Sequence, residues 1–159
     1  MIKKFAEERE IFMYCDFHAH SRKKNIFMYG CSSGKPNDRL RERIFPRLLS
    51  KNCDVFSFDD SNFAIQKSKE STARVVMWKE LNIINSYTLE ASFCGADFGK
   101  FADHHFNTQM LEELGHNFCD SLCDFCDPEQ VKMVNVLQEL QIMIHSKDND
   151  EDDNNDRYF

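Results

Sequence analysis

The residues of this sequence with the clearest capacity for chemistry are an aspartate and two histidines in the segment D-F-H-A-H, at Asp16, His18 and His20. They alternate with apolar residues after a short apolar run, which predicts the end of a buried strand. Successive strand side chains point to opposite faces, so these three emerge on one side. Imidazole is a good zinc ligand, and a carboxylate can hold its second N–H. The spacing therefore predicts a metal site or, because one H-x-H pair supplies too few ligands, a pair of buried, hydrogen-bonded histidines.

A cluster of cations follows this strand directly, at Arg22, Lys23 and Lys24. Three cations in a tight turn are typical of a solvated loop. They also lie next to the histidine pair, where guanidinium and ammonium groups could donate charge-assisted hydrogen bonds to a carboxylate. Both interpretations stay open, and Arg22 and Lys23 are candidates for binding an anionic substrate.

Glu90 is the second candidate for chemistry. Residues 86–93 alternate between polar and apolar side chains and predict a strand that presents this carboxylate. A lone glutamate between apolar neighbours is costly to bury unless it is paired or catalytic. Two interpretations follow: an edge-strand glutamate that faces water, or a general base beside a zinc-bound water.

Other histidines and cysteines give weaker signals. His104 and His105 are adjacent, so on an extended segment they point apart and are poor joint ligands. Cys119, Cys123 and Cys126 fall on one stripe of a predicted helix. A zinc site there would need a fourth ligand, and structural sites usually combine two chain segments, so small core thiols are expected.

The elements that must position these groups are read from hydrophobic periodicity and helix caps. The predicted strands lie at 11–20, 26–29 and 86–93, and the predicted helices lie at 39–50, 72–81, 108–124 and 128–144. Pro46 is expected to bend or break the first of these helices, and residues 51–63 show no clean period. Helices and strands alternate along the chain, which favours an α/β fold with a mixed sheet flanked by helices.

Composition limits the class of protein. The 159 residues suit one domain, and the formal charge of −7 divides unevenly. Residues 147–159 carry −4 of it and predict a disordered acidic tail, which leaves −3 for the domain at 1–146. A body this close to neutral does not indicate a broad nucleic-acid surface. The sequence has no apolar run of eighteen residues and no signal-peptide core, so we expect a soluble intracellular protein with reduced cysteines and no membrane contact.

Four motifs, in this order, resemble the cytosolic carboxypeptidase branch of the M14 metallocarboxypeptidases. They are C-D-F-H-A-H-S-R-K-K-N-I-F-M-Y-G-C, K-S-K-E-S-T-A-R-V-V, S-Y-T-L-E-A-S-F-C-G and F-C-D-S-L-C-D-F-C-D-P. In that family a His-x-x-Glu pair and a later histidine bind one zinc ion. The His-x-x-Glu motif and the Asn-Arg pair that binds the substrate are missing here and would lie upstream of Met1. The resemblance therefore implies a partial zinc-carboxypeptidase fold, the C-terminal half of a catalytic domain, with an incomplete set of zinc ligands.

The resemblance also implies a role for each matching residue. The later zinc-binding histidine corresponds to His18, and the general base corresponds to Glu90. Arg74, in S-T-A-R-V-V, corresponds to the basic residue that binds the acidic side chain of the leaving residue. Asp16 and His20 would support the zinc ligand. Members of this branch remove glutamates from the tails of tubulin and other acidic proteins in the cytoplasm, so the expected partners are glutamate-rich C-termini, at microtubules or cilia.

Two functions of different classes follow from these observations. The first is a zinc metallocarboxypeptidase that hydrolyses C-terminal glutamates, of which this chain is a part. The second is a catalytically inactive remnant, or a binding module for acidic tails, because the His-x-x-Glu motif is absent. A third hypothesis is a metal-dependent hydrolase of another class, with Asp16, His18 and His20 as its ligands.

Overall fold

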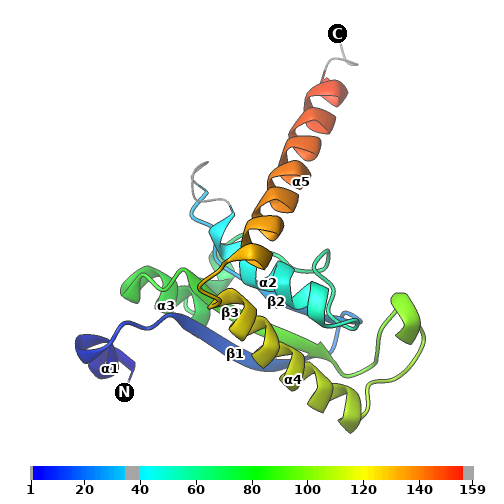
Figure 1. Cartoon of the computed structure of the whole chain (residues 1–159), viewed down its shortest axis with the longest axis horizontal. Coiled ribbons are helices and arrows are strands. Elements are labelled where there is room, and N and C mark those ends of the chain that lie inside the picture. The colour runs from blue at the N-terminus through cyan, green and yellow to red at the C-terminus, as the bar shows by residue number, and fades with distance from the viewer. Residues whose placement is uncertain (1, 35–39, 156–159) are drawn as a thin grey trace.

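The computed structural model describes residues 2–34 and 40–155, and for residues 145 and 147–155 it describes the backbone alone. The elements are, in chain order, α1 (Ile2–Glu8), β1 (Met13–His20), β2 (Ile26–Tyr29), α2 (Arg41–Asn52), the 3₁₀ helix η2 (Lys67–Lys69), α3 (Ala73–Leu81), β3 (Asn85–Ser92), the 3₁₀ helix η3 (Gly99–Phe101), α4 (Thr108–Phe125) and α5 (Val131–Asn155) (Figure 1).

The three strands form one sheet in the order β1-β3-β2. β1 runs parallel to β3, and β2 runs antiparallel to it. The prediction of a mixed sheet flanked by helices is confirmed. The prediction that β1 is buried is wrong: Phe17 is 56% exposed, because β1 is an edge strand and no described residue pairs with its outer edge.

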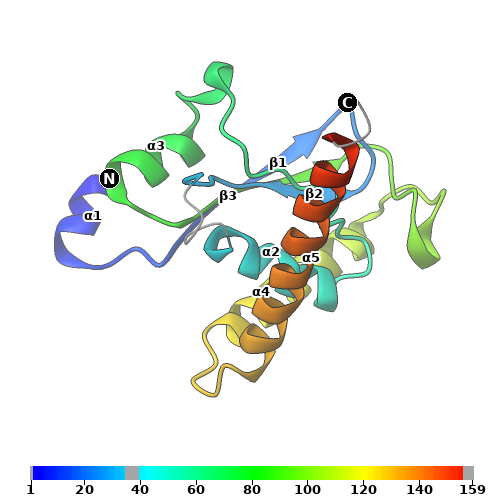
Figure 2. The same cartoon turned by 90° about the horizontal axis from the view of Figure 1, so that it is seen from above.

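Helices α2 and α4 cover one face of the sheet (Figure 2). Phe45 of α2 is fully buried between them, with its ring 5.0 Å from Phe118 and 5.9 Å from Tyr87. Burying one phenylalanine contributes about 1.5–3 kcal/mol, and each favourable ring pair adds about 0.5–1.5 kcal/mol. This aromatic core holds the sheet against the helices and leaves the opposite face of the sheet available.

Pro46 lies inside α2, which is continuous through it. Proline has no N–H, so the carbonyl of Glu42 loses its partner in the helix. The hydroxyl of the buried Tyr87 donates to that carbonyl at 3.0 Å, which satisfies it. The prediction that Pro46 could break the helix is therefore wrong, and the replacement bond ties α2 to β3.

Helix α5 begins at Val131, three residues later than predicted. The side chain of Asp127 accepts from the N–H of Glu129, and Gln130 has a positive φ of 54°, so residues 127–130 form a turn. The helix buries Val136 and Leu140 against α2. Its backbone continues past 144, the predicted end. The side chains of residues 147–159 lie outside the described residues, so the boundary at 146 and the disordered acidic tail stay predictions.

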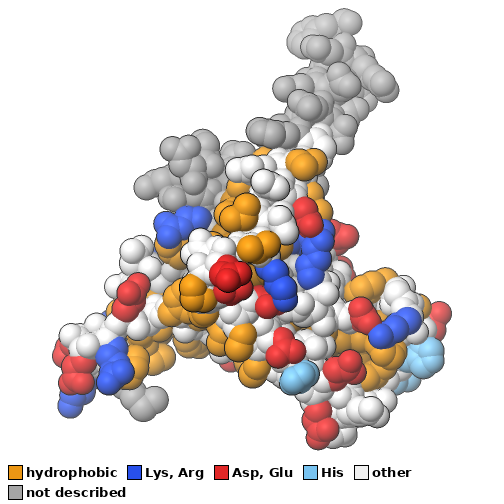
Figure 3. Space-filling view, viewed as in Figure 1, with side chains coloured by type: hydrophobic (Ala, Val, Ile, Leu, Met, Phe, Trp, Pro, Cys, Tyr) orange, Lys and Arg blue, Asp and Glu red, His pale blue; other side chains and the backbone are white. Residues whose placement is uncertain are grey.

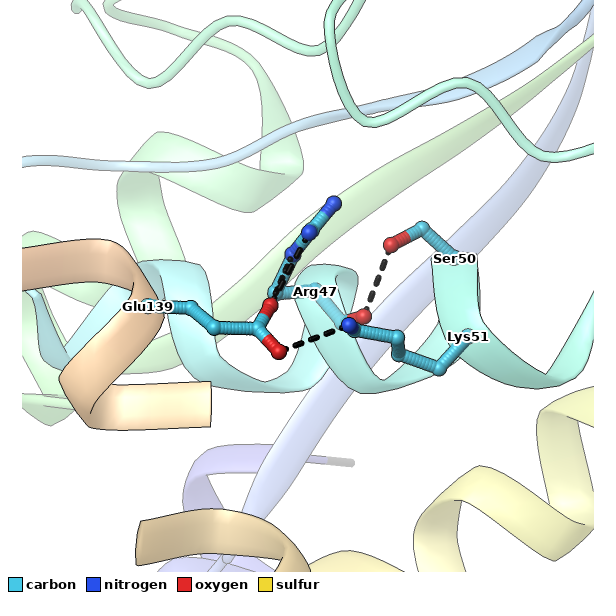
Figure 4. A network of polar contacts seen from close by, with 4 residues as sticks. All are labelled: Arg47, Ser50, Lys51 and Glu139. Atoms are coloured by element: carbon cyan, nitrogen blue, oxygen red, sulfur yellow. Dashed lines mark hydrogen bonds and ion pairs between the residues drawn. The ribbon is translucent and has the colours of Figure 1, made fainter. Parts of the chain in front are cut away.

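A network of ion pairs fixes α5 on α2 (Figure 4). The carboxylate of Glu139 accepts from the Arg47 guanidinium at 2.9 Å and from the Lys51 ammonium at 2.7 Å. Ser50, on the same turn, donates to the carbonyl of Arg47 at 2.7 Å. The hydrogen bond from Lys51 and that from Arg47 hold the pKa of Glu139 below its usual value, against the opposing effect of burial.

The predicted core position of three cysteines is wrong: Cys119 and Cys123 on α4, and Cys126 directly after it, are exposed. The side of α4 that meets the core carries Leu114 and Phe118 instead, so the cysteine stripe faces outward. Figure 3 shows the helical face of the molecule, where hydrophobic side chains lie between acidic and basic ones and neither charge dominates. Among the described helices, none is long and apolar enough to cross a membrane.

The network on α5 predicts a pH-dependent stability. Because the folded-state pKa of Glu139 is depressed, its ion pairs stabilise the fold above the ordinary glutamate pKa of about 4.3 and are lost as the pH falls through the folded-state value. Glu139→Gln should lower the free energy of unfolding at pH 7 by about 1 kcal/mol, since these side chains are partly exposed.

Thermal melts at pH 3 to 8 measure this difference, which should shrink as the pH falls below the ordinary glutamate pKa. Glu112→Gln is the matched control, because Glu112 is exposed and makes no ion pair among the described residues. A difference between Glu139→Gln and the parent that stays constant from pH 8 to 3 would contradict the assigned network.

Candidate functional site

The pairing of β1 with β3 brings two residues with catalytic potential side by side. His18 is the register partner of Glu90, and Asp16 is the partner of Thr88. Because side chains alternate along both strands, these four lie on one face of the sheet, while Leu89 points into the core on the other. The alternative in which Glu90 faces water from an edge strand is wrong, because β3 is the central strand.

This face borders a cavity of about 810 Å³, a volume typical of small-molecule sites. Its lining includes the predicted acidic and imidazole side chains Asp16, His18, His20 and Glu90. It also includes the three predicted cations Arg22, Lys23 and Arg74. Every residue predicted for the site thus reaches one cavity, although the segments that carry them span residues 16–90.

His18 is held by the neighbouring carboxylate. Its Nε2 lies 3.2 Å from Oδ2 of Asp16, and the histidine side chain is about half exposed. No hydrogen bond within the described structure occupies its Nδ1. A carboxylate that holds one ring nitrogen fixes the orientation of an imidazole and leaves the other nitrogen available to a ligand.

His20 has a different role. Its Nδ1 accepts from the backbone N–H groups of Arg22 at 3.0 Å and Lys23 at 3.1 Å. With two donors aimed at Nδ1, the ring proton resides on Nε2. Its ring packs at 5.3 Å from that of Phe27. His20 therefore shapes the basic loop after β1 rather than chelating an ion together with His18.

Arg74 is 6% exposed, which is unusual for a charged side chain. Its Nη1 lies 3.4 Å from Oγ1 of Thr88, its guanidinium lies 5.4 Å from the ring centre of Tyr29, and its buried Nε has no hydrogen-bond partner in the described structure. A buried cation with unused donors is unfavourable unless it meets an anion. This is the strongest sign of an anionic ligand in the cavity.

The N-terminus of α3 adds to that sign. Thr72, Ala73 and Arg74 all line the cavity. Thr72 occupies the N-cap position, but its side chain makes no capping bond and instead donates to the carbonyl of Lys69 at 2.8 Å. The first backbone N–H groups of the helix, which carry partial positive charge, are left without that cap. Helix and guanidinium together favour negative charge at this point.

Tyr29 lies between the opposing charges of the cavity. Burial raises the pKa of its hydroxyl, the nearby charge of Glu90 raises it further, and Arg74 lowers it. The hydroxyl therefore stays protonated at neutral pH and can act as a hydrogen-bond donor to a ligand.

The basic loop between β1 and β2 is anchored by Asn25, which has a positive φ of 69° and is 4% exposed. Its side-chain N–H groups donate to Asp60 at 2.8 Å and Asp97 at 2.7 Å, and its side-chain oxygen accepts from the N–H of Asp97. Lys23 lies above the loop, 4.8 Å from the ring centre of Phe27, and donates to a backbone carbonyl. The hydrogen bonds of Asn25 thus hold the loop that carries the cations in a fixed conformation.

The cavity or anchoring residues that were not identified from the sequence include Asn25, Tyr29, Lys69 and Thr88. The alternation of β3 places Thr88 on the face of Glu90 and could have found it. Tyr29 could have been found in the same way from β2. Asn25 lies in a loop and Lys69 in a single 3₁₀ turn, and neither is long enough for a periodicity that reports the direction of a side chain.

The side chains of the cavity include types that bind a divalent metal, but too few of them lie together to hold one. His18 offers an imidazole that Asp16 orients, as metal-binding histidines require. A catalytic zinc site takes three protein ligands. The described residues contain no group of three His, Cys, Asp or Glu side chains that could hold an ion. The hypothesis that Asp16, His18 and His20 bind a metal together is therefore wrong.

Comparison of sequences finds relatives over nearly the whole chain. It is 53% identical over 150 residues to cytosolic carboxypeptidase 2 of Mus musculus, and 54% identical over 149 residues to cytosolic carboxypeptidase 3 of Bos taurus. These alignments cover 94% and 90% of this chain. They cover 17% and 14% of the relatives, so the chain spans about one sixth of their length. No family model matches the chain.

Comparison of structures finds the same kind of protein. A metallo-carboxypeptidase from Pseudomonas aeruginosa, in complex with (2-guanidinoethylmercapto)succinic acid, matches with a TM-score of 0.64 at 15% identity, over 86% of this chain and 35% of that chain. One from Burkholderia cenocepacia matches with a TM-score of 0.58 at 15% identity, over 76% of this chain and 32% of that chain. The predicted partial metallocarboxypeptidase fold is confirmed.

The hydrogen bonds of His20 predict how the basic loop responds to mutation. His20→Ala removes the acceptor for two backbone N–H groups, each bond being worth about 1 kcal/mol. Amide hydrogen exchange at residues 22 and 23 should become about fivefold faster or more. His20→Asn restores a side-chain acceptor and should recover part of the protection, whereas equal exchange in all three proteins would rule out this role.

Proposed function

We propose that this chain, which belongs to the cytosolic carboxypeptidases over the segment that it spans, contributes the substrate-binding and proton-transfer side of a zinc carboxypeptidase site. The reaction is hydrolysis of glutamates from acidic C-termini. The observation that carries the proposal is the buried, under-bonded guanidinium of Arg74, which lines the same cavity as His18 and Glu90.

Substrate binding follows from the charges of the cavity. A carboxylate of the terminal glutamate would pair with Arg74, whose planar fork suits a two-point contact, and would gain from the uncapped end of α3. Arg22 and Lys23 would attract the acidic chain at the mouth of the cavity. Glutamate-rich protein tails, those of tubulin among them, have the required chemistry.

The chemistry needs a group that moves a proton next to the scissile bond. Zinc, when bound, supplies a Lewis acid that polarises the scissile carbonyl and lowers the pKa of a water. His18 would be one of its ligands, with its ring oriented by Asp16. The Glu90 carboxylate would accept a proton from the attacking water and pass it to the nitrogen of the leaving amine. Its place beside His18 on the parallel strand suits this role.

The remaining zinc ligands would come from outside the described residues. His18 is carried by β1, whose outer edge has no pairing partner among those residues. A segment that pairs with this edge would run next to His18 on the same face of the sheet, which is where further ligands are needed. The relatives are about six times as long as this chain and leave room for such a segment.

A second candidate function is a module that binds acidic tails without cleaving them. The incomplete donor set favours it, because the anion-binding features need no metal. The two functions share Arg74 and differ in the need for His18 and Glu90. For either function we propose a site of action in the cytoplasm, at microtubules or cilia. The word "cytosolic" in the names of the relatives supports the cytoplasm and does not bear on microtubules or cilia.

The catalytic proposal can be tested in a chimera in which this chain replaces the matching segment of the mouse relative. The chimera should release glutamate from a labelled peptide with a glutamate-rich C-terminus. Glu90→Gln should lower turnover by about 10²-fold or more, with the zinc content unchanged, because it removes the proton acceptor. His18→Ala should lose both zinc and turnover.

Glu112→Gln, on the exposed side of α4, is the control and should behave as the parent chimera. Parental turnover in the Glu90→Gln chimera would show that the general base is assigned wrongly. A chimera that binds zinc and peptide but never releases glutamate would favour the binding module.

A further inference from the structure

The outer side of α4 carries a group of exposed thiols that the proposed function does not use. Four of the seven cysteines of the chain are exposed: Cys94, Cys119, Cys123 and Cys126. Burial raises the pKa of the other three thiols, which therefore stay protonated and are poor nucleophiles. Cys94 lies in the loop after β3, whereas the other exposed cysteines follow one another at intervals of four and three residues along α4 and its C-cap.

Cys123 and Cys126 form a C-x-x-C pair at the end of the helix. α4 ends at Phe125, so Cys126 is the C-cap residue, with φ −94° and ψ 1° (Figure 1). Its N–H donates to the carbonyl of Leu122 at 3.0 Å and to that of Cys123 at 3.2 Å. Residues three apart in a helical turn have Cα atoms about 5 Å apart. That separation lies within the range that a disulfide bridges.

The third cysteine of the group, Cys119, is a poorer partner for Cys123. Residues four apart inside a regular helix have Cβ atoms about 5–6 Å apart, and a disulfide needs about 4 Å. Both residues lie within α4, so closing that gap would distort the helix. Cys126 lies outside the helix, and its backbone can adjust without breaking a hydrogen bond inside it. Cys119 and Cys126, seven residues apart, are about 10.5 Å from each other along the helix and cannot be bridged.

The backbone between the two thiols is held in place by its neighbours. The carboxylate of Asp124 accepts from the side-chain amide of Asn52 at 2.9 Å and from the ammonium group of Lys132 at 2.7 Å. The ring of Phe125 packs 5.9 Å from that of Phe45 in the aromatic core. Because this segment is already ordered, joining the two thiols costs little further conformational entropy.

Binding of a metal is the other chemistry open to neighbouring thiols. A structural zinc site takes four cysteine or histidine ligands. The part of the chain that the structure describes contains no group of three His, Cys, Asp or Glu side chains that could hold an ion. The two thiols of the C-x-x-C pair are therefore better suited to react with each other.

We infer that Cys123 and Cys126 form a reactive dithiol that small disulfides, such as oxidised glutathione, convert reversibly into an intramolecular disulfide. The thiolate of one cysteine attacks a sulfur of the small disulfide, which breaks its S–S bond, releases one small thiol and leaves a mixed disulfide. The thiolate of the other cysteine then displaces the second small thiol. The pair loses two electrons to the small disulfide, and the two cysteine protons end on the two released thiols.

This modification site is independent of the proposed function, because it lies on the helical side of the sheet and shares no residue with the cavity. In a reducing compartment, disulfides of this kind are usually transient and serve in redox sensing rather than as structural bonds.

The 159-residue chain can be tested by equilibration with mixtures of reduced and oxidised glutathione, followed by blocking of free thiols with N-ethylmaleimide. Trypsin then releases residues 101–132 as one peptide, whose cysteines are Cys119, Cys123 and Cys126. Mass spectrometry should find a peptide with an internal disulfide and a single maleimide, on Cys119. Its share should rise with the proportion of oxidised glutathione.

Cys119→Ser is the matched control, because it removes a thiol of the same group and leaves the pair intact. It should shift the midpoint of oxidation by less than about twofold. Cys126→Ser and Cys123→Ser should each lower the amount of internal disulfide by about tenfold or more, since the thiols that remain are poorly placed for a bond. All three side chains are exposed, so the variants should keep the circular dichroism spectrum of the parent.

Three results would overturn the inference. The first is an internal disulfide that persists in Cys126→Ser or disappears in Cys119→Ser. The second is a peptide that carries three maleimides in every glutathione mixture. The third is a stable mixed disulfide with glutathione on Cys123 or Cys126 in place of the internal bond.

Discussion

The site depends on the alternation of side chains along one central strand. In β3, Tyr87 and Leu89 point into the aromatic core while Thr88 and Glu90 point into the cavity. A slip of one residue would exchange the two sets and bury the carboxylate. The core therefore fixes the register of β3, and the parallel pairing with β1 then places His18 beside Glu90. The hydroxyl of Tyr87, bonded to the carbonyl freed by Pro46, anchors the same strand to α2.

Arg74 works against the stability of the fold. Among the described residues, the buried guanidinium has a long hydrogen bond to Thr88 and an Nε without a partner, an arrangement that is unfavourable by several kcal/mol when no anion is present. Its position in the first turn of α3 adds repulsion from the helix dipole. The ring of Tyr29 and the hydroxyl of Thr88 offset part of this cost. Residues that lower the stability of the unliganded protein but can bind an anion are typical of functional sites, where ligand binding is favoured over stability.

Sequence reasoning succeeded where periodicity is strong. The boundaries of β2 were predicted to the residue, β3 within one residue, and strand alternation assigned His18 and Glu90 to the face that now borders the cavity. It failed where tertiary packing decides. The cysteines at the end of α4 have the helical spacing of residues that pack into a core. Only the position of the sheet relative to the helix shows that they face outward. The side chain of Asp127 accepts from the N–H of Glu129 in an Asx turn instead of capping a helix that begins at residue 128. Helix α5 therefore starts later than expected. The burial of Arg74 has no local signal, because it arises from two strands distant in sequence.

The two sides of the cavity differ in rigidity, and this bears on the choice between catalysis and binding. The Arg74 side is formed by a buried residue, the turn that the Thr72–Lys69 hydrogen bond closes and the central strand, so it is preorganised within the described chain. The His18 side lies on an edge strand, with its imidazole half exposed and held by a single carboxylate. Under the proposed function, recognition of an acidic terminus would require only the residues described here, whereas hydrolysis would require further ligands delivered across the edge of β1 that no described residue pairs with. In that proposal, binding and catalysis would use the same site, and the segment that pairs with the edge of β1 would decide whether the bound peptide is also cleaved.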